Sequence, residues 1–293
     1  MTDMSTRLGR LSLPNPVLTA SGCAGYGREL HQFFDVAELG AVVTKSIMLR
    51  PRSGRPTPRM AETPSGMLNS IGLQGPGIDA FIEHDLAWLA SVGARTAVSI
   101  AGGRPGEFAE LTARLAGHPA VSLIEVNISC PNVASRGQVF ACDPHAAAQV
   151  ISAVRAAADA STANTGLPAP PVFAKLSPDV TDITEIARAC AQAGADGLSL
   201  VNTLLGMVID LDTMAPALGG ITGGLSGPAI RPVAVRCVWQ VHKALPYMPI
   251  LGMGGISSGA DALQFILAGA SAVSVGTAVF GDPDAPLRVL AEL

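Results

Sequence analysis

Short apolar segments of strand character alternate with helical segments along most of the 293-residue chain. The expected strands are Pro16–Ala20, Ala41–Lys45, Arg95–Ile100, Leu123–Ile128, Val172–Lys175, Gly197–Val201, Pro249–Gly252 and Ala272–Val275. Such alternation without a break in composition predicts an α/β fold, a (β/α)8 TIM barrel, formed by residues 1–293 as a single domain. The active site is then expected at the C-terminal ends of the strands. A doubly wound open sheet is the alternative, but no GxGxxG follows the first strand.

The intervening segments carry helical signals or an excess of glycine. The expected helices are Leu30–Leu39, Asp79–Ser91, Gly106–Leu115, Pro144–Ala160, Val180–Ala193, Ile230–Leu245, Gly259–Ala268 and Pro286–Leu293. Leu8–Leu13 reads as a short strand that covers the bottom of the barrel. Gly66–Gly77 contains too much glycine for a helix, and we expect it to be a loop that folds over a binding site. Leu204–Pro228 is a long excursion from the barrel.

Composition excludes several classes of function. The chain is 48% hydrophobic and 14% charged with a net charge of −4, and it has no basic run, which argues against nucleic acid as the main partner. Five scattered cysteines without CxxC or Cys/His spacing predict no metal or iron–sulfur site in this chain. They also fit a reducing cytoplasm, and no signal-peptide core is present at the N-terminus. The uncharged run Ala262–Gly281 reads as a buried helix and strand rather than a membrane span.

The segment Ile124–Val133 places a thiol among hydrogen-bonding side chains. Asn127 lies at the end of the expected strand, and Ser129, Cys130, Pro131 and Asn132 follow. An isolated cysteine is most often a buried small hydrophobe. The position of Cys130 between two asparagines at a strand tip favours a catalytic role instead.

Other strand ends indicate a phosphorylated, planar cofactor. Gly254-Gly255 and Gly276-Thr277 follow the seventh and eighth strands, where barrels commonly hold a phosphate on backbone N–H groups. Lys45 and Lys175 end the second and fifth strands. A fixed positive charge beside the pyrimidine ring of a flavin stabilises its anionic reduced form, so lysines at these tips suit a flavin.

Four asparagines converge on the same predicted face: Asn69, Asn127, Asn132 and Asn202. Primary amides both donate and accept hydrogen bonds, so they suit a planar ligand with alternating N–H and C=O groups, such as a pyrimidine. Cys130 would act as a general base beside a carbonyl while hydride leaves the neighbouring carbon for the flavin. A nucleophilic role is weaker because no histidine lies nearby in sequence. The five histidines are read as surface residues.

Together these residues resemble the class 1 dihydroorotate dehydrogenases, from about Leu8 to about Pro283. The matching motifs are NISCPN (127–132), SGMLNSIGLQ (65–74), KLSPDVTDI (175–183), ADGLSLVNTL (195–204), ITGGLSGPAI (221–230) and GMGGI (252–256). The cysteine of NISCPN resembles the catalytic base of class 1 enzymes, whereas class 2 enzymes have serine at this position. The segments SGCAGYG, ITGGLSGPAI and NISCPNV are most similar in sequence to class 1B enzymes.

The resemblance implies an FMN-containing enzyme that oxidises dihydroorotate to orotate in pyrimidine biosynthesis, with Cys130 removing the C5 proton while hydride passes from C6 to FMN. It implies FMN contacts from Ser21, Lys45, Ser46, Ser99, Asn127, Lys175, Val201, Gly227, Gly254, Gly255, Gly276 and Thr277. It implies substrate contacts from Lys45, Asn69, Ser70, Ile71, Gly72, Leu73, Asn127, Asn132, Asn202 and Thr203. It also implies a homodimer core joined to an electron-transfer subunit, as a heterotetramer, with FAD and a 2Fe–2S cluster on that partner passing electrons to NAD.

The chain departs from the family pattern at three places. Ser99 stands where the family usually has asparagine, Gly75 replaces the asparagine of LQNPG, and the chain ends soon after the eighth strand. Three other functions stay open. They are a pyrimidine-reducing module like that of dihydropyrimidine dehydrogenases, a class 1A enzyme that reduces fumarate, and a non-catalytic barrel that binds FMN or phosphate as a sensor.

Overall fold

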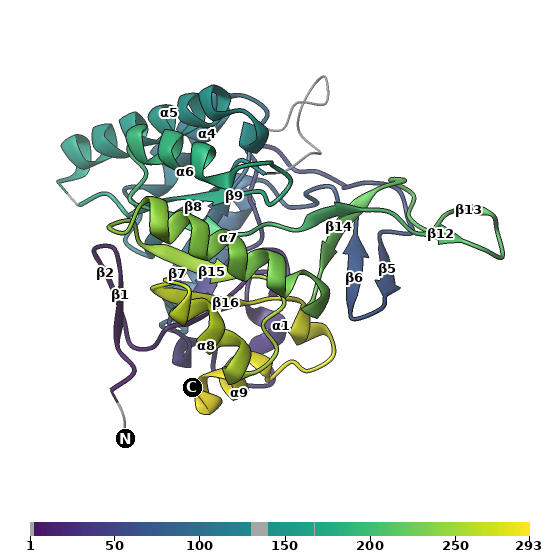
Figure 1. Ribbon diagram of the computed structural model, residues 1–293. Coiled ribbons are helices and arrows are strands. Elements are labelled where there is room, and N and C mark those ends of the chain that lie inside the picture. Colours follow the sequence, from purple (N-terminus) through teal and green to yellow (C-terminus); the bar gives the residue numbers. More distant parts are fainter. Residues whose placement is uncertain (1–2, 130–139, 167) are drawn as a thin grey trace.

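Eight parallel strands form a closed barrel in the computed structural model, which describes residues 3–129, 140–166 and 168–293 (Figure 1). The strands are β3 (Val17–Thr19), β4 (Val42–Val43), β7 (Thr96–Ile100), β8 (Val121–Asn127), β9 (Val172–Leu176), β10 (Gly197–Leu200), β15 (Ile250–Met253) and β16 (Ala272–Val275). They lie in the order β3-β16-β15-β10-β9-β8-β7-β4. A parallel bridge between Leu18 and Ala41 joins β3 to the start of β4, the first and last strands in this order, and closes the barrel. The (β/α)8 prediction is confirmed, and the open sheet is excluded.

The barrel interior is filled by its own apolar cluster, separate from the layer between strands and helices. Leu18, Val43, Leu123 and Phe173 are among its fully or almost fully buried members. A Cβ atom at Gly197 would lie 2.2 Å from the Phe173 ring, so the glycine makes the room that this large side chain needs. The lower barrel is therefore a packed floor under the strand ends.

Helices surround the barrel (Figure 1). They are α1 (Arg28–His31), α2 (Ile78–Ala80), η2 (Phe81–Leu86), α3 (Ala87–Ser91), α4 (Pro105–Leu115), α5 (Pro144–Thr165), α6 (Ile183–Gln192), α7 (Arg231–Ala244), α8 (Gly259–Leu267) and α9 (Ala285–Glu292), with short turns η1 (Val36–Glu38), η3 (Phe140–Cys142), η4 (Pro228–Ile230) and η5 (Thr277–Phe280). Side-chain caps start several of them: Asp143 accepts from two amides of α5, and Asp182 accepts from one of α6.

The expected helix Leu30–Leu39 is wrong, because only α1 and the turn η1 form there. The Asp35 carboxylate accepts a hydrogen bond from the Ala37 amide and starts a new turn. A short acidic side chain that bonds its own backbone competes in this way with helix continuation. The run Ala262–Gly281 contains most of α8 and all of β16, so the expected helix and strand are confirmed. The helix is buried on one face only, since Leu263 and Leu267 are exposed. None of the helices in the described residues is long and apolar enough to cross a membrane.

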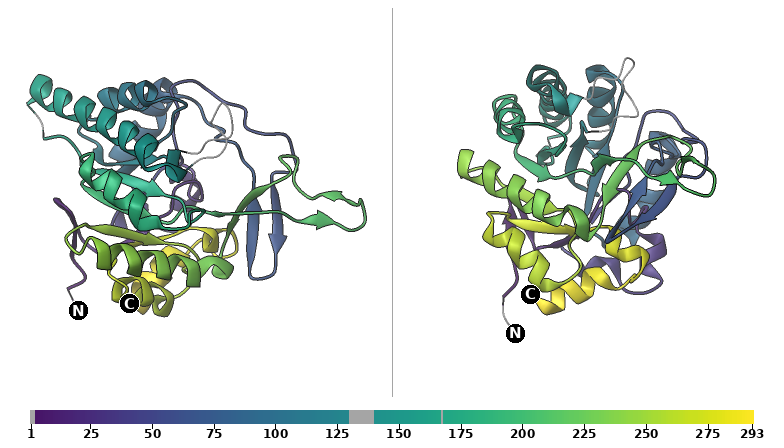
Figure 2. Two further views of the ribbon diagram at one scale, coloured as in Figure 1. Left: turned by 45° about the horizontal axis from the view of Figure 1, so that its top comes forward. Right: turned by 45° about the vertical axis from the view of Figure 1, so that its right-hand side comes forward.

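A separate antiparallel sheet, here called the arm sheet, projects beyond the barrel mouth (Figure 2). It consists of β11 (Leu204–Gly206), β14 (Gly223–Ser226), β6 (Gly66–Asn69) and β5 (Met60–Thr63), in that order. A small hairpin, β12 (Ile209–Asp210) and β13 (Ala215–Pro216), forms its tip. The prediction that all of Gly66–Gly77 is a loop is therefore wrong for its first four residues. These pair with strands on both sides and so satisfy their backbone groups.

A hairpin covers the opposite end of the barrel from the arm sheet (Figure 1). The expected single strand Leu8–Leu13 is two strands, β1 (Thr6–Leu8) and β2 (Leu11–Leu13), joined by a turn in which Gly9 has φ +64°. Leu8 and Leu13 pack into the interior cluster. The hairpin thus closes the bottom, as expected, and leaves the arm side as the open end.

Candidate active site

A cavity of about 320 Å³ lies at the C-terminal ends of the barrel strands and is bounded on one side by the arm sheet. Twelve predicted site residues line it: Ser21, Lys45, Ser46, Asn69, Ile71, Gly72, Leu73, Asn127, Lys175, Asn202, Thr203 and Thr277. Parallel strands bring their carboxyl ends to one edge, and most of these residues come from six barrel strand ends. The others come from β6 of the arm sheet and from the loop that follows it. Ser70, Ser99, Val201, Gly227, Gly254, Gly255 and Gly276 are not among the lining residues. Cys130 and Asn132 lie outside the described residues.

Ser46 connects several of these residues. Its hydroxyl accepts a hydrogen bond from Asn127 Nδ2 at 3.0 Å, and it lies 2.9 Å from Ser99 Oγ and 3.4 Å from Ser21 Oγ. Ser99 is fully buried behind it, and the Ser99 amide donates to Thr44 Oγ1. The structure therefore places Ser99 as support for Ser46, and its direct contact with a ligand stays a prediction.

The asparagine amides at the mouth are held in fixed orientations. Asn202 Nδ2 donates to Asn127 Oδ1 at 3.4 Å, and Asn202 Oδ1 accepts from the Thr203 amide at 2.9 Å. Across the cavity, Asn69 Nδ2 donates to the Gly224 carbonyl at 3.3 Å. Each amide nitrogen carries a second N–H that these bonds do not use. The cavity thus presents oriented donors suited to ring carbonyls.

Two lysines face the same cavity in different environments. Lys45 is half-buried, and burial, with a smaller contribution from the Arg59 charge, lowers its pKa. Lys175 is 5% exposed, and its Nζ lies 3.6 Å from Glu125 Oε1. The Lys175 carbonyl accepts from Ser129 Oγ at 2.5 Å, which ties the strand end to the segment after β8. Both cations can meet an electron-rich ring edge or a carboxylate.

Glycine turns follow β15 and β16, next to Thr277 in the cavity lining. Gly254 and Gly255 have φ of +128° and +76°, and a Cβ at Gly255 would lie 2.6 Å from the Gly227 carbonyl oxygen. No described residue accepts a hydrogen bond from the amide N–H groups of Gly254, Gly255 or Gly276. Free N–H groups beside a cationic cavity fit the phosphate and ring of FMN.

The cavity also contains residues that the sequence reasoning did not predict. They are Gly22, Cys23, Met60, Met67, Ser129, Asp179, Leu205, Gly224, Ser226 and Phe280. Cys23 lies in the small-residue loop after β3, next to the predicted site residue Ser21. Burial raises the pKa of its thiol to about 11, although the Lys175 charge acts in the opposite direction, so Cys23 is a neutral wall at pH 7. Five of the ten lie on the arm sheet and could not be predicted, because β14 joins segments that are far apart in the chain. They are Met60, Met67, Leu205, Gly224 and Ser226.

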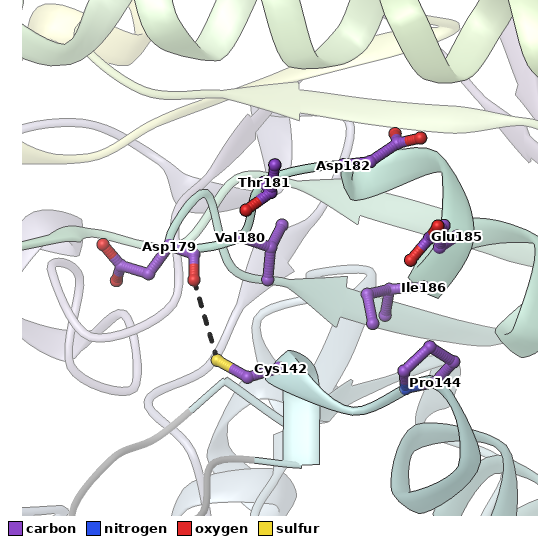
Figure 3. Close-up of a pocket in the computed structure, with 8 residues that line it drawn as sticks. All are labelled: Cys142, Pro144, Asp179, Val180, Thr181, Asp182, Glu185 and Ile186. Carbon is purple, nitrogen blue, oxygen red and sulfur yellow. Dashed lines mark hydrogen bonds between the residues drawn. The ribbon is translucent and has the colours of Figure 1, made fainter.

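A second, more open cavity of about 550 Å³ lies beside the start of α6 (Figure 3). Cys142 Sγ donates to the Asp179 carbonyl at 3.7 Å, and Asp182 uses its carboxylate to cap α6. The lining contains three acidic side chains and no cation. Among the described residues, the two cavities share only Asp179. None of the predicted site residues that the structure describes is among the lining residues of the second cavity, so the predicted chemistry belongs to the first cavity.

Comparison with known proteins gives a family for this arrangement. The profile described as dihydroorotate dehydrogenase matches residues 3–293.

The chain belongs to the dihydroorotate dehydrogenase family.

Its relatives are similar over nearly their whole length. The protein from Trichlorobacter lovleyi is 54% identical over 98% of this chain and 90% of its own. The protein from Pelobacter propionicus is 54% identical over 98% of this chain and 91% of its own length. The protein from Geobacter sulfurreducens is 51% identical over 99% of this chain and 92% of its own length. All three are named dihydroorotate dehydrogenase B (NAD(+)), catalytic subunit. The dihydroorotate dehydrogenase resemblance seen in the motifs is confirmed.

Proposed function

We propose that this chain is the catalytic subunit of a class 1B dihydroorotate dehydrogenase, and that residues 1–293 act as one FMN-binding domain that oxidises dihydroorotate to orotate. The observation that carries the proposal is the lining of one cavity, where oriented asparagine amides and two lysines lie beside glycine turns with free N–H groups. The names of the relatives that match nearly the full chain support it.

The cofactor would lie across the barrel mouth. Gly254, Gly255, Gly276 and Thr277 would hold its phosphate, while Lys175 and Ser46 would face its ring. When bound, FMN supplies a two-electron acceptor for the hydride that leaves C6 of dihydroorotate. Lys175 would stabilise the negative charge that the ring gains, because a cation in a buried site acts through a low effective dielectric.

The substrate would lie over that ring. Asn69, Asn127 and Asn202 would bind the carbonyl and N–H groups of the pyrimidine, and the backbone of 71–73 would cover it. Lys45 would pair with the substrate carboxylate. Cys130, beyond the described residues, would take the C5 proton on its sulfur as the C6–H bond breaks, so one proton and one hydride leave together.

Electrons would leave through a partner subunit. We propose a homodimer core of this chain, joined to a subunit that carries FAD and a 2Fe–2S cluster and that reduces NAD. The words "catalytic subunit" and "NAD(+)" in the relatives' names support this arrangement.

The test is the visible spectrum of the purified chain under anaerobic conditions, before and after dihydroorotate. We expect a yellow protein that bleaches with dihydroorotate and stays yellow with dihydrouracil as a matched control. A protein that binds FMN but bleaches only with dihydrouracil would move the function to pyrimidine reduction, and one that binds no added FMN would overturn the flavin proposal.

The electron acceptor needs a separate test. The reduced chain, mixed with fumarate or with NAD and its purified partner subunit, should be reoxidised only in the second case. Rapid reoxidation by fumarate alone would identify a class 1A enzyme instead.

A further inference from the structure

A carboxylate is buried inside the barrel directly beneath the cavity. Glu125 lies on β8 two residues before Asn127, so its side chain points to the same, inner face of the strand. It is completely inaccessible to solvent, and its Oε1 lies 3.6 Å from Lys175 Nζ. The charged pair therefore spans the boundary between the packed barrel interior and the cavity floor.

Nothing else in the described interior compensates the Glu125 charge. Neither of its oxygens has a hydrogen-bond partner, and the hydroxyls of Ser199 and Ser274 in the same barrel are also unpartnered. The residues paired with Glu125 on the neighbouring strands are Ser99 and Phe173, and Ser99 already bonds Ser46. Lys175 is thus the one cation that this carboxylate meets among the described residues.

A buried pair of this kind is a poor device for stability alone. Removing two charges from water is costly, and well-packed apolar residues of similar volume often do as well or better. An interior that otherwise uses Leu, Val and Phe could have used them here too. The placement of the pair under the site points to a role at the site.

We propose that Glu125 is a positioning residue, whose carboxylate holds the ammonium group of Lys175 at the cavity floor, against the flavin ring. This inference rests on the proposed function. Among the described residues Lys175 has no other ion-pair partner, so without Glu125 its side chain loses the contact that fixes it under the ring.

The other charged or titratable groups near Lys175 cannot replace Glu125. Cys23, after β3, is a neutral thiol because burial raises its pKa to about 11. Lys45, after β4, lines the same cavity and has the same charge sign as Lys175. Asp179, after β9, uses its carboxylate to accept from the Leu205 amide and the Ser177 hydroxyl.

The test measures the midpoint potential of bound FMN at about pH 7, relative to free FMN in the same buffer. It compares the wild-type holoprotein with E125Q, with the charge-free double variant E125Q/K175M, and with E110Q as a control for loss of an exposed glutamate on α4. The readout needs bound flavin only and does not depend on turnover.

We expect the wild type and E110Q to show the same offset from free FMN. In E125Q the ammonium group loses its fixed place under the ring, so the preference for reduced flavin should drop about tenfold, or about 30 mV for a two-electron couple. The double variant, which lacks the ammonium group, should show a fall at least as large. An E125Q offset equal to or above that of the wild type overturns the proposal.

Two further outcomes are decisive. If E125Q does not fold, E125D retains the carboxylate one methylene farther away and should show a smaller fall in the offset, whereas a wild-type offset would contradict the role. A wild type that binds FMN and reacts with dihydroorotate beside an unchanged E125Q refutes this inference alone. A wild type that binds no FMN refutes the proposed function itself.

Discussion

Single side chains at the barrel mouth are arranged as donors and supports in two layers. Ser46 belongs to the inner layer, where it joins Asn127, Ser99 and Ser21. The amide of Asn127 is held by this hydroxyl on one side and by Asn202 on the other. The orientation of the outer amides therefore depends on a hydroxyl that is itself almost completely buried.

We expect Ser46→Ala to raise KM for dihydroorotate about tenfold. The substitution removes the hydrogen bond to Asn127 and leaves a buried Ser99 hydroxyl unpaired, a loss of about 1–2 kcal/mol. Steady-state kinetics with an artificial acceptor measure the effect. The control is Ser53→Ala, an exposed position, and an unchanged KM for S46A would show that Asn127 is oriented by other contacts.

Gly75 offers a site for stabilisation. A Cβ there would lie 3.4 Å from Tyr26 Oη, a buried hydroxyl without a hydrogen-bond partner in the described chain. Burial, together with the Asp85 and Glu29 charges, raises the pKa of Tyr26, so the hydroxyl stays protonated. An asparagine amide at position 75 can reach it, and the unfolded chain also loses freedom when glycine is replaced.

We therefore expect Gly75→Asn to raise the free energy of unfolding by about 1 kcal/mol. Gly75→Ala, which supplies the Cβ without the amide, should give less than half of this gain. Urea denaturation of the three proteins measures the difference. Equal gains for both variants would mean that the backbone effect acts alone.

At the scale of elements, the sequence predicted the barrel strands well because each is an apolar run that stops at polar or glycine residues. The arm sheet could not be predicted. Its strands β6 and β14 are glycine-rich, and their pairing joins segments far apart in the chain. The failed helix near Asp35 has a different cause, since a local carboxylate bond outweighed a favourable helical pattern.

The site could be predicted where a lysine or an asparagine stands at the end of an expected strand, because such a side chain faces the barrel mouth. Lys45, Asn127, Lys175 and Asn202 were found in this way, and they share one cavity. Glu125 was not, because an inward glutamate inside a strand looks like any other non-apolar interruption. Its significance depends on which side chain of the neighbouring strand β9 lies beside it, and only the strand register determines that.

The start of α8 carries a pH-sensitive ion pair. Asp261 lies 2.6 Å from Arg231 on α7 and accepts from the Ser257 amide and hydroxyl. Burial acts to raise the pKa of Asp261, but the hydrogen bonds from Ser257 and Ser258 and the Arg231 charge outweigh it and lower the pKa. The stabilisation is therefore complete above the unfolded-state pKa of about 3.9 and is lost as pH falls below it.

We expect Asp261→Asn to cost about 1–2 kcal/mol of unfolding free energy at pH 6 and much less at pH 3. Denaturant unfolding at the two pH values tests this. Asp212→Asn, at the exposed arm tip, should be nearly neutral at both. A cost that is equal at pH 3 and pH 6 would mean that packing, not charge, links α7 and α8.

For the whole molecule, the arm sheet is the main departure from a plain barrel, and its tip is unusually apolar. Leu211 and Met214 are 79% and 80% exposed, and Ile209 and Met207 lie nearby on the same hairpin segment. Contiguous exposed apolar side chains of this kind favour burial against another surface. The arm is therefore the part of the chain best suited to the proposed homodimer core.

We expect the double variant L211E/M214E to shift the protein from dimer to monomer at micromolar concentration, measured by analytical ultracentrifugation. The resulting monomer should stay folded, because both side chains are exposed in the single chain. Leu267→Glu on α8, a position 73% exposed, is the control and should leave the dimer intact. Dimers that persist in the arm variant would place the interface elsewhere.

The arm sheet also has a consequence for the order in which the chain becomes functional during its synthesis. One wall of the cavity needs β14 to pair with β6, and the glycine turns at Gly254 and Gly276 are made later still. A nascent chain that has emerged only as far as α6 already contains Lys45, Asn127 and Lys175 but has neither wall nor cradle. High-contact-order pairings of this kind form slowly. Capture of the proposed cofactor would therefore wait until both the arm sheet and the glycine turns have been synthesised.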